Sequence, residues 1–170
     1  MPLDKQRADA IASRRSVHVR RTAFTDAPCP VARSLDQIGD WWSLLIIRDA
    51  LEGVRRFSEF QKHLGLARNI LSARLAKLVS HGILRLQPAS DGSAYQEYAL
   101  TEKGESLRLV MYALHQWGGD FLFPQDEEPP PLVEKNTGER VARLEMTLAD
   151  GRVLRPSEVT VLKPEPANGS

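Results

Sequence analysis

Residues 57–100 constrain what this chain can fold into more than any other stretch. Ser58 and Gln61 form a capping-box pattern that predicts the start of a short helix, and Gly65 predicts the turn that ends it. A second helix is predicted over 68–81, where leucines recur at helical spacing and a glycine follows. Two short helices joined through a glycine are typical of the helix-turn-helix motif.

A predicted hairpin follows the second helix. The segments 83–87 and 95–100 have strand character, and the Ser-Asp-Gly-Ser sequence at 90–93 favours a tight turn between them. A hairpin directly after the second helix of such a motif is a wing. The predicted fold class is therefore mainly α with a small β wing, a winged helix-turn-helix domain.

The distribution of charge over this motif indicates a polyanionic partner. The whole chain has a formal net charge of +1, yet it contains no carboxylate between Glu59 and Asp91. This interval holds five bases, which are Lys62, Arg68, Arg74, Lys77 and Arg85. A local basic excess on a helix-turn-helix pattern predicts double-stranded DNA as the partner.

The second predicted helix would carry the surface that reads DNA. Its outward face is small and polar, which lets a helix enter the major groove, where Asn69 could bond an adenine edge and Ser72 a base or phosphate. Arg74 lies nearer the core side, so its role is either phosphate binding or purely structural. For any of these residues taken alone, an ordinary solvated helix face is the alternative. The full predicted DNA-binding set is Ser58, Arg68, Asn69, Ser72, Ala73, Arg74, Lys77 and Arg85.

Helices are predicted on both sides of the motif. One begins at Pro30, a second spans 42–51 and is apolar nearly all round, and a long helix capped by Thr101 runs to Gly118. The apolar stripe of the long helix either packs within its own domain or forms a homodimer interface, and the small size of the domain favours the dimer. The expected interface residues are Leu35, Leu107, Val110, Met111, Leu114, Trp117 and Phe121.

Five segments are expected along the chain. Residues 1–27 form a basic arm, either solvated or lying along phosphates, and residues 28–123 form the DNA-binding and dimerisation domain. Residues 124–134 form a proline-rich acidic linker, 135–163 a β-hairpin and 164–170 a disordered tail. The hairpin would extend the dimer interface, cover an effector pocket or cap the long helix.

Over about residues 29–121 the chain resembles the HxlR-type winged helix-turn-helix transcriptional regulators of bacteria. The resemblance rests on CPVARSLDQIGDWWSLLIIRDALEGVRRFSEFQKHL, NILSARLAKLVSHGIL and EYALTEKG, which begin at positions 29, 69 and 97. It implies a homodimer that joins through the first and last domain helices and binds an inverted-repeat operator. Trp41 replaces a basic residue common in the family, which removes one candidate phosphate contact. Tyr95 and Gln96 stand where the wing commonly has an arginine and the tip holds Asp91, so weak insertion of the wing into the minor groove is expected.

Cys29 is a candidate redox sensor, because the resemblance implies that the matching cysteine of several relatives senses oxidants or electrophiles. The start of a helix at Pro30 and the nearby Arg33 both favour a reactive thiolate. The alternative is a small buried residue that packs at the dimer interface.

These observations together predict a sequence-specific DNA-binding regulator, a repressor that acts as a homodimer and responds to a small-molecule or oxidative signal. A winged-helix module that binds protein without specific DNA contact is the alternative. No enzyme is expected, because the chain has no nucleophile with an adjacent histidine and acid and no glycine-rich phosphate loop. One cysteine and four scattered histidines predict no metal or cofactor, and the lack of a long apolar run predicts a cytoplasmic protein with no membrane partner.

Overall fold

The computed structural model describes residues 23–162, so most of the expected basic arm and the expected tail lie outside the described residues. The chain divides into two compact units, residues 1–40 and 41–170. The described part of the first unit contains helix α2, Pro30–Ile38, with proline at its start as expected. Within this unit, the Arg33 Nε donates to the Ala27 carbonyl at 2.5 Å.

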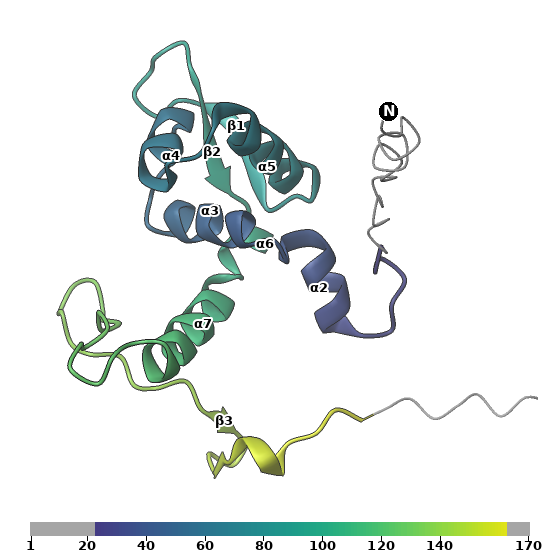
Figure 1. The fold of residues 1–170 in the computed structure, drawn as a ribbon, viewed down its shortest axis with the longest axis vertical. Helices are drawn as coiled ribbons and strands as arrows, with labels where there is room; N and C mark the ends of the chain where they lie inside the picture. The colour runs from purple at the N-terminus through teal and green to yellow at the C-terminus, as the bar shows by residue number, and fades with distance from the viewer. Residues whose placement is uncertain (1–22, 163–170) are drawn as a thin grey trace, which may run out of the picture. The chain divides into compact units, whose positions relative to one another are not determined.

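The second unit is built around α3, Trp41–Leu51, which packs against the helix pair α4, Phe57–Leu64, and α5, Arg68–Ser80 (Figure 1). Gly65 adopts a left-handed conformation with φ of 63° and makes the turn between α4 and α5. The helix-turn-helix prediction is thereby confirmed. Its core consists of completely buried side chains, which include Ile46, Ile47, Phe60, Leu71, Leu75 and Leu78.

The predicted capping box, Ser58 with Gln61, is wrong by two residues. Helix α4 has Arg56 as its N-cap residue, and the Glu59 carboxylate accepts a hydrogen bond from the Arg56 backbone N–H at 2.9 Å. That hydrogen bond, together with one from the Arg55 N–H, lowers the pKa of Glu59. A carboxylate at the third helical position can accept from a free backbone N–H at the start of a helix, and so can a hydroxyl at the cap position. The sequence pattern alone did not show which of these two arrangements begins α4.

The wing is an antiparallel pair of strands, β1, Leu84–Pro88, and β2, Gln96–Leu100. Leu84 lies opposite Leu100 and Pro88 opposite Gln96. Strand β2 packs on α3 and β1 packs on α5. Both strands begin one residue later than predicted, and the winged helix-turn-helix fold is confirmed.

The long helix predicted after Thr101 is instead two helices, α6, Glu102–Glu105, and α7, Arg108–Phe121. Thr101 is the expected cap, and its hydroxyl accepts from the Gly104 N–H at 3.1 Å. At the break, the Ser106 hydroxyl donates to the Lys103 carbonyl at 2.8 Å, a local bond of the kind that competes with helix continuation.

The region after α7, residues 124–162, contains much less regular structure than predicted. Its hairpin consists of β3, Met146–Thr147, and β4, Val153–Leu154, followed by a short 3₁₀ helix, Pro156–Glu158. A hairpin is present within the expected range 135–163, but each of its strands is only two residues long. An isolated hairpin without a sheet or helix to cover one face has little to stabilise it.

The hairpin region is attached to α7 mainly through polar groups. The Gln116 amide accepts from the Leu144 N–H at 2.8 Å and donates to the Leu144 carbonyl at 3.2 Å. Arg143 forms a bidentate ion pair with Asp120, and this pairing lowers the pKa of the Asp120 carboxyl. Across residues 23–162, none of the helices has the length and apolar character needed to cross a membrane.

Candidate nucleic-acid interface

The outward face of α5 is exposed and composed of small or polar residues. Leu71, Leu75 and Leu78 point into the core and are fully buried, which fixes the rotation of the helix. The opposite side carries the exposed residues Asn69, Ser72, Ala73, Ala76 and Ser80. A helix with this face can approach the floor of a major groove closely and still offer an amide and hydroxyls to base edges.

The beginning of α5 favours a phosphate. Ala67 is the N-cap residue and offers no side-chain cap, and the first turn holds no acid, so the positive end of the helix dipole is not compensated locally. Arg68 lies here with its guanidinium 5.4 Å from the centre of the Phe57 ring on α4. This contact orients the cation without neutralising its charge.

The other predicted DNA-binding residues differ in exposure. Ser58 and Arg85 are exposed, whereas Arg74 and Lys77 are half-buried on α5. The Arg85 guanidinium lies on β1, where it donates to the Gln87 side chain and the Leu100 carbonyl, both at 3.3 Å. The structure therefore collects Arg68, Asn69, Ser72 and Ala73 on one exposed surface and sets Arg74 and Lys77 back toward the core.

A buried carboxylate, Glu97, organises the base of the wing. Its side chain is only 2% exposed and accepts hydrogen bonds from the Gln87 amide at 2.8 Å and from the Arg55 guanidinium at 3.2 Å. It also accepts from both the backbone N–H and the hydroxyl of Ser90, each at 3.2 Å. These donors, with Gln87 the largest contributor, lower the pKa of Glu97.

Arg55 is a residue that the sequence pattern did not single out. In addition to its ion pair with Glu97, its carbonyl accepts from the Tyr98 N–H at 2.8 Å, so the loop before α4 is joined to the wing. The pairing of Arg55 and Glu97 spans 42 residues of sequence. The only local signal was the basic dipeptide before α4, which does not reveal a distant partner.

The tip of the wing is not basic. The Arg56 guanidinium pairs with Asp91 in the turn, and residues 88–96 include no lysine or arginine. Asp91 also accepts from the Ser93 N–H, and hydrogen bonds from Ser93 together with Arg56 lower its pKa. The tip therefore offers no cation to a DNA minor groove.

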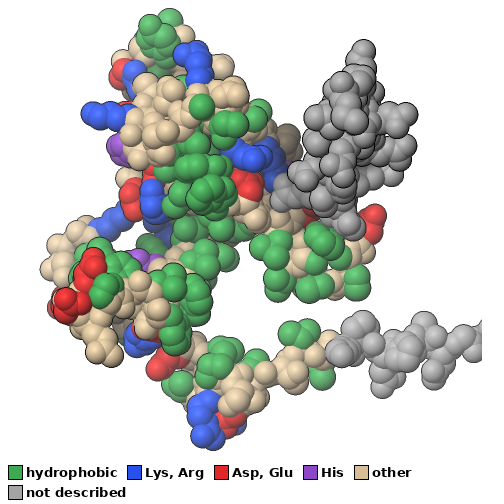
Figure 2. Space-filling model, in the orientation of Figure 1, with side chains coloured by type: hydrophobic (Ala, Val, Ile, Leu, Met, Phe, Trp, Pro, Cys, Tyr) green, Lys and Arg blue, Asp and Glu red, His purple; other side chains and the backbone are tan. Residues whose placement is uncertain are grey.

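The residues predicted to form a dimer interface fall into two groups. Val110, Leu114, Trp117 and Phe121 are exposed along one side of α7, with 54% of Trp117 and 69% of Phe121 accessible. Figure 2 shows apolar side chains gathered over this helix. Leu107 and Met111 are half-buried, and Leu35 is exposed on α2.

Cys29 is the N-cap residue of α2 and is exposed. It therefore does not belong to the core of its own chain. The nearby guanidinium of Arg33 is engaged by the Ala27 carbonyl.

Comparison with known proteins identifies the class that this fold defines. Residues 37–126 match the family model described as HxlR-like helix-turn-helix. An uncharacterized HTH-type transcriptional regulator of Mycobacterium tuberculosis, Rv3095, is 38% identical over 140 residues, which cover 82% of this chain and 86% of the relative. The protein is a helix-turn-helix transcriptional regulator.

Two solved structures extend the similarity beyond the family domain. PA1607, proposed to be a transcription factor, is 51% identical with a TM-score of 0.78, and the match covers 84% of this chain and 99% of PA1607. PA1374 from Pseudomonas aeruginosa, described in the same way, is 42% identical with a TM-score of 0.57, over 82% and 96% of the two chains. The chain belongs to the HxlR-like helix-turn-helix family.

Proposed function

We propose that this regulator binds double-stranded DNA sequence-specifically as a homodimer and represses transcription from an inverted-repeat operator. The observation that carries the proposal is the exposed, carboxylate-free face of α5, with Asn69 and Ser72 as base-reading residues and Arg68 at the phosphate-binding end of the helix. An amide that reads a base edge contributes to sequence specificity, whereas a cation near a phosphate contributes to affinity for any DNA. The two contributions can therefore be tested separately.

The homodimer is supported by the exposed apolar side of α7. Trp117 and Phe121 have ring centres 5.9 Å apart and together form an aromatic patch. Large aromatic side chains at this exposure are typical anchors of protein interfaces. A two-fold dimer would place two recognition helices about 34 Å apart, which is one turn of DNA.

The test is binding to a selected operator and to random DNA of equal length, measured by fluorescence anisotropy at several salt concentrations. Operator DNA can be obtained by repeated selection from a random-sequence pool with the wild-type protein. We expect Asn69→Ala to lose about 1–3 kcal/mol on the operator and little on random DNA. Arg85→Gln should weaken both alike and make the salt dependence shallower by about one unit of slope.

Arg152→Gln is the matched control for charge, because Arg152 is exposed in the hairpin region, outside the DNA-binding motif. Equal losses by Asn69→Ala on operator and random DNA would remove that residue from base reading. Failure of the selection to enrich any sequence would favour the competing function, a winged-helix module that binds protein. The wing tip, which carries Asp91 and no lysine or arginine, also supports that alternative.

A response to oxidants through Cys29 is a separate part of the proposal. Its support is the exposure of the thiol at the start of α2. Treatment with a quinone or peroxide should change operator affinity of the wild-type protein and leave Cys29→Ser unaffected. The same response in both proteins would rule out this role.

A further inference from the structure

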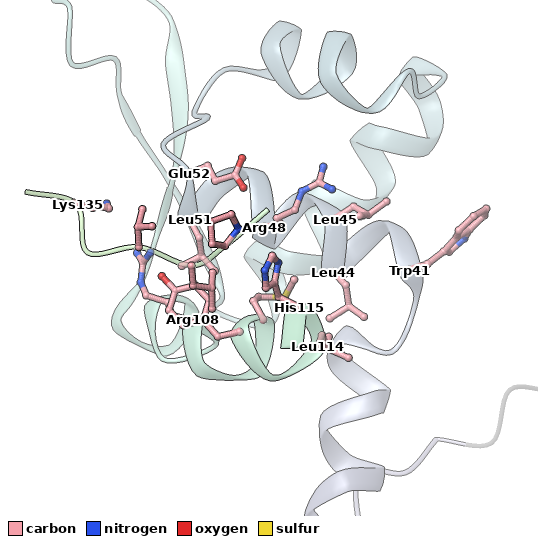
Figure 3. A pocket seen from close by; sticks show the side chains of 15 residues that line it. Trp41, Leu44, Leu45, Arg48, Leu51, Glu52, Arg108, Leu114, His115 and Lys135 are labelled. Carbon is pink, nitrogen blue, oxygen red and sulfur yellow. The ribbon is translucent and has the colours of Figure 1, made fainter. Parts of the chain in front are cut away.

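A cavity of about 820 Å³ lies within the second unit, between α3, α7 and the segment 131–135 (Figure 3). We call this segment the strap. Leu44, Leu45 and Leu51 of α3 form one wall, Met111 and Tyr112 of α7 another, and Leu132 and Val133 of the strap a third. The volume lies in the range of about 300–1,000 Å³ typical of small-molecule sites.

The strap is a defined structural element. The His115 side chain hydrogen-bonds the Pro130 carbonyl at 2.8 Å, which attaches the start of the strap to α7. Val133 pairs with Arg140 in an antiparallel bridge, and the Glu134 carboxylate accepts from the N–H groups of Asn136 and Thr137. The strap is thereby folded back on itself, and it lies beyond the residues matched by the family model.

The charges at the cavity are predominantly positive. Arg48, Arg108 and Lys135 line it against a single carboxylate, Glu52. Arg48 already pairs with Asp49 and Arg108 with Glu105, each at 2.7 Å. Among residues 23–162, no carboxylate lies within ion-pair distance of the Lys135 ammonium, so this cation is available to a ligand.

Two of the three cations lie toward one end of the cavity. Figure 3 shows Arg108 and Lys135 at this end, Leu44 and Leu114 in the middle with Arg48 and His115, and Trp41 at the far end. An elongated molecule with an anionic head and an apolar body matches this arrangement.

The polar cavity residues of α7 and the aromatic patch lie on nearly opposite sides of the helix, and Leu114 borders both surfaces. At 3.6 residues per turn, Arg108, Tyr112 and His115 fall on one face of the helix, whereas Val110, Trp117 and Phe121 fall on the other. A second copy of the chain seated on the aromatic patch would leave Arg108, Tyr112 and His115 accessible and would meet the cavity only on the side of Leu114. This separation favours a small molecule over a protein segment as the occupant.

We propose that this cavity binds an organic monoanion with an extended apolar body, such as a medium-chain carboxylate, with Lys135 and Arg108 holding the anionic head. The inference is independent of DNA binding, because ligand binding can be measured without an operator. Where DNA binding holds, α3 provides a route for regulation. Helix α3 lines the cavity through Arg48, whose guanidinium donates to the Oδ1 atom of the buried Asp49. The Oδ2 atom of Asp49 lies 3.7 Å from the His63 ring on α4, so α3 connects the cavity to the helix-turn-helix motif.

The test uses decanoate as the probe, titrated into the full chain by isothermal calorimetry, with decanol as the uncharged analogue. We expect one decanoate per chain, with decanol binding at least about fivefold more weakly because it lacks the charge that Lys135 recognises. Lys135→Gln should weaken decanoate about fivefold and leave decanol unchanged. Val133→Trp should abolish binding of both, because the ring fills the cavity.

The control variants are matched in charge and exposure. Arg152→Gln removes a cation away from the cavity, and Val159→Trp adds an indole at a valine that is 44% exposed, compared with 46% for Val133. Both should bind decanoate like the wild type, and circular dichroism should show that every variant is folded. Absence of decanoate binding, or binding that Lys135→Gln and Val133→Trp leave intact, would overturn the proposal. Decanoate binding that dissociates a dimer in sedimentation velocity would instead assign the cavity to a second copy.

Discussion

The winged helix-turn-helix region and the C-terminal region, α7 with residues 124–162, are stabilised in different ways. The first buries Phe60, Leu71 and Leu75 completely, whereas α7 has no buried side chain. In the second region, Val141, Met146 and other apolar residues are exposed, and polar contacts such as that of Gln116 hold the segments together. The first region therefore buries its own apolar core, whereas the second leaves apolar surface exposed.

The largest expected effect comes from the same substitution made in both regions. Phe60→Ala removes a fully buried ring and should lower the free energy of unfolding by about 3–5 kcal/mol. Phe121→Ala removes a ring that is 69% exposed and should change the stability of the monomer by less than about 0.5 kcal/mol. Urea denaturation at low protein concentration measures both, and similar losses would contradict the distinction between the regions.

An intermediate effect is expected from acid, which acts on a carboxylate in each region. The pKa of Glu97 in the wing is lowered from 4.5 by its hydrogen bonds, so its stabilising contribution is complete above about pH 4.5 and is lost as the pH falls through the lowered value. The pKa of Asp120 on α7 is lowered from 3.8 by its pairing with Arg143. Its stabilising contribution is therefore complete above about pH 3.8 and is lost as the pH falls through the lowered value.

The two carboxylates can be separated by NMR during an acid titration. Glu97→Gln should remove the pH dependence of the Tyr98 amide signal, which reports on the contact between wing and Arg55, and leave that of the Leu144 amide intact. Loss of both pH dependences in this variant would mean that the wing and the C-terminal region open together.

The smallest expected effect is on the attachment of the C-terminal region. Gln116→Ala removes two hydrogen bonds to Leu144 and should cost about 1 kcal/mol or less each, confined to that region. Gln61→Ala is the matched variant in the other region, because the Gln61 amide donates to the Leu66 carbonyl. Hydrogen exchange should increase at Leu144 only for the first variant, and a global increase in exchange would contradict this assignment.

Local sequence patterns predicted the helix-turn-helix region well. The buried leucines of α5, the turn at Gly65 and the cap at Thr101 depend on residues within a few positions of one another, where periodicity and capping preferences act. The same local patterns predicted more strand structure in the C-terminal hairpin than the structure contains. Alternation of apolar and polar residues predicts long strands only when one face is covered, and in residues 140–162 it is not.

The sequence by itself determined the order of the helices, the position of the wing and the basic, carboxylate-free character of α5, because these depend on neighbouring residues. Only the tertiary structure decided which distant side chains meet. Arg55 reaches Glu97 across 42 residues, and the cavity combines α3, α7 and the strap. Contacts of this kind depend on how the elements pack in three dimensions, and no local pattern along the chain encodes them.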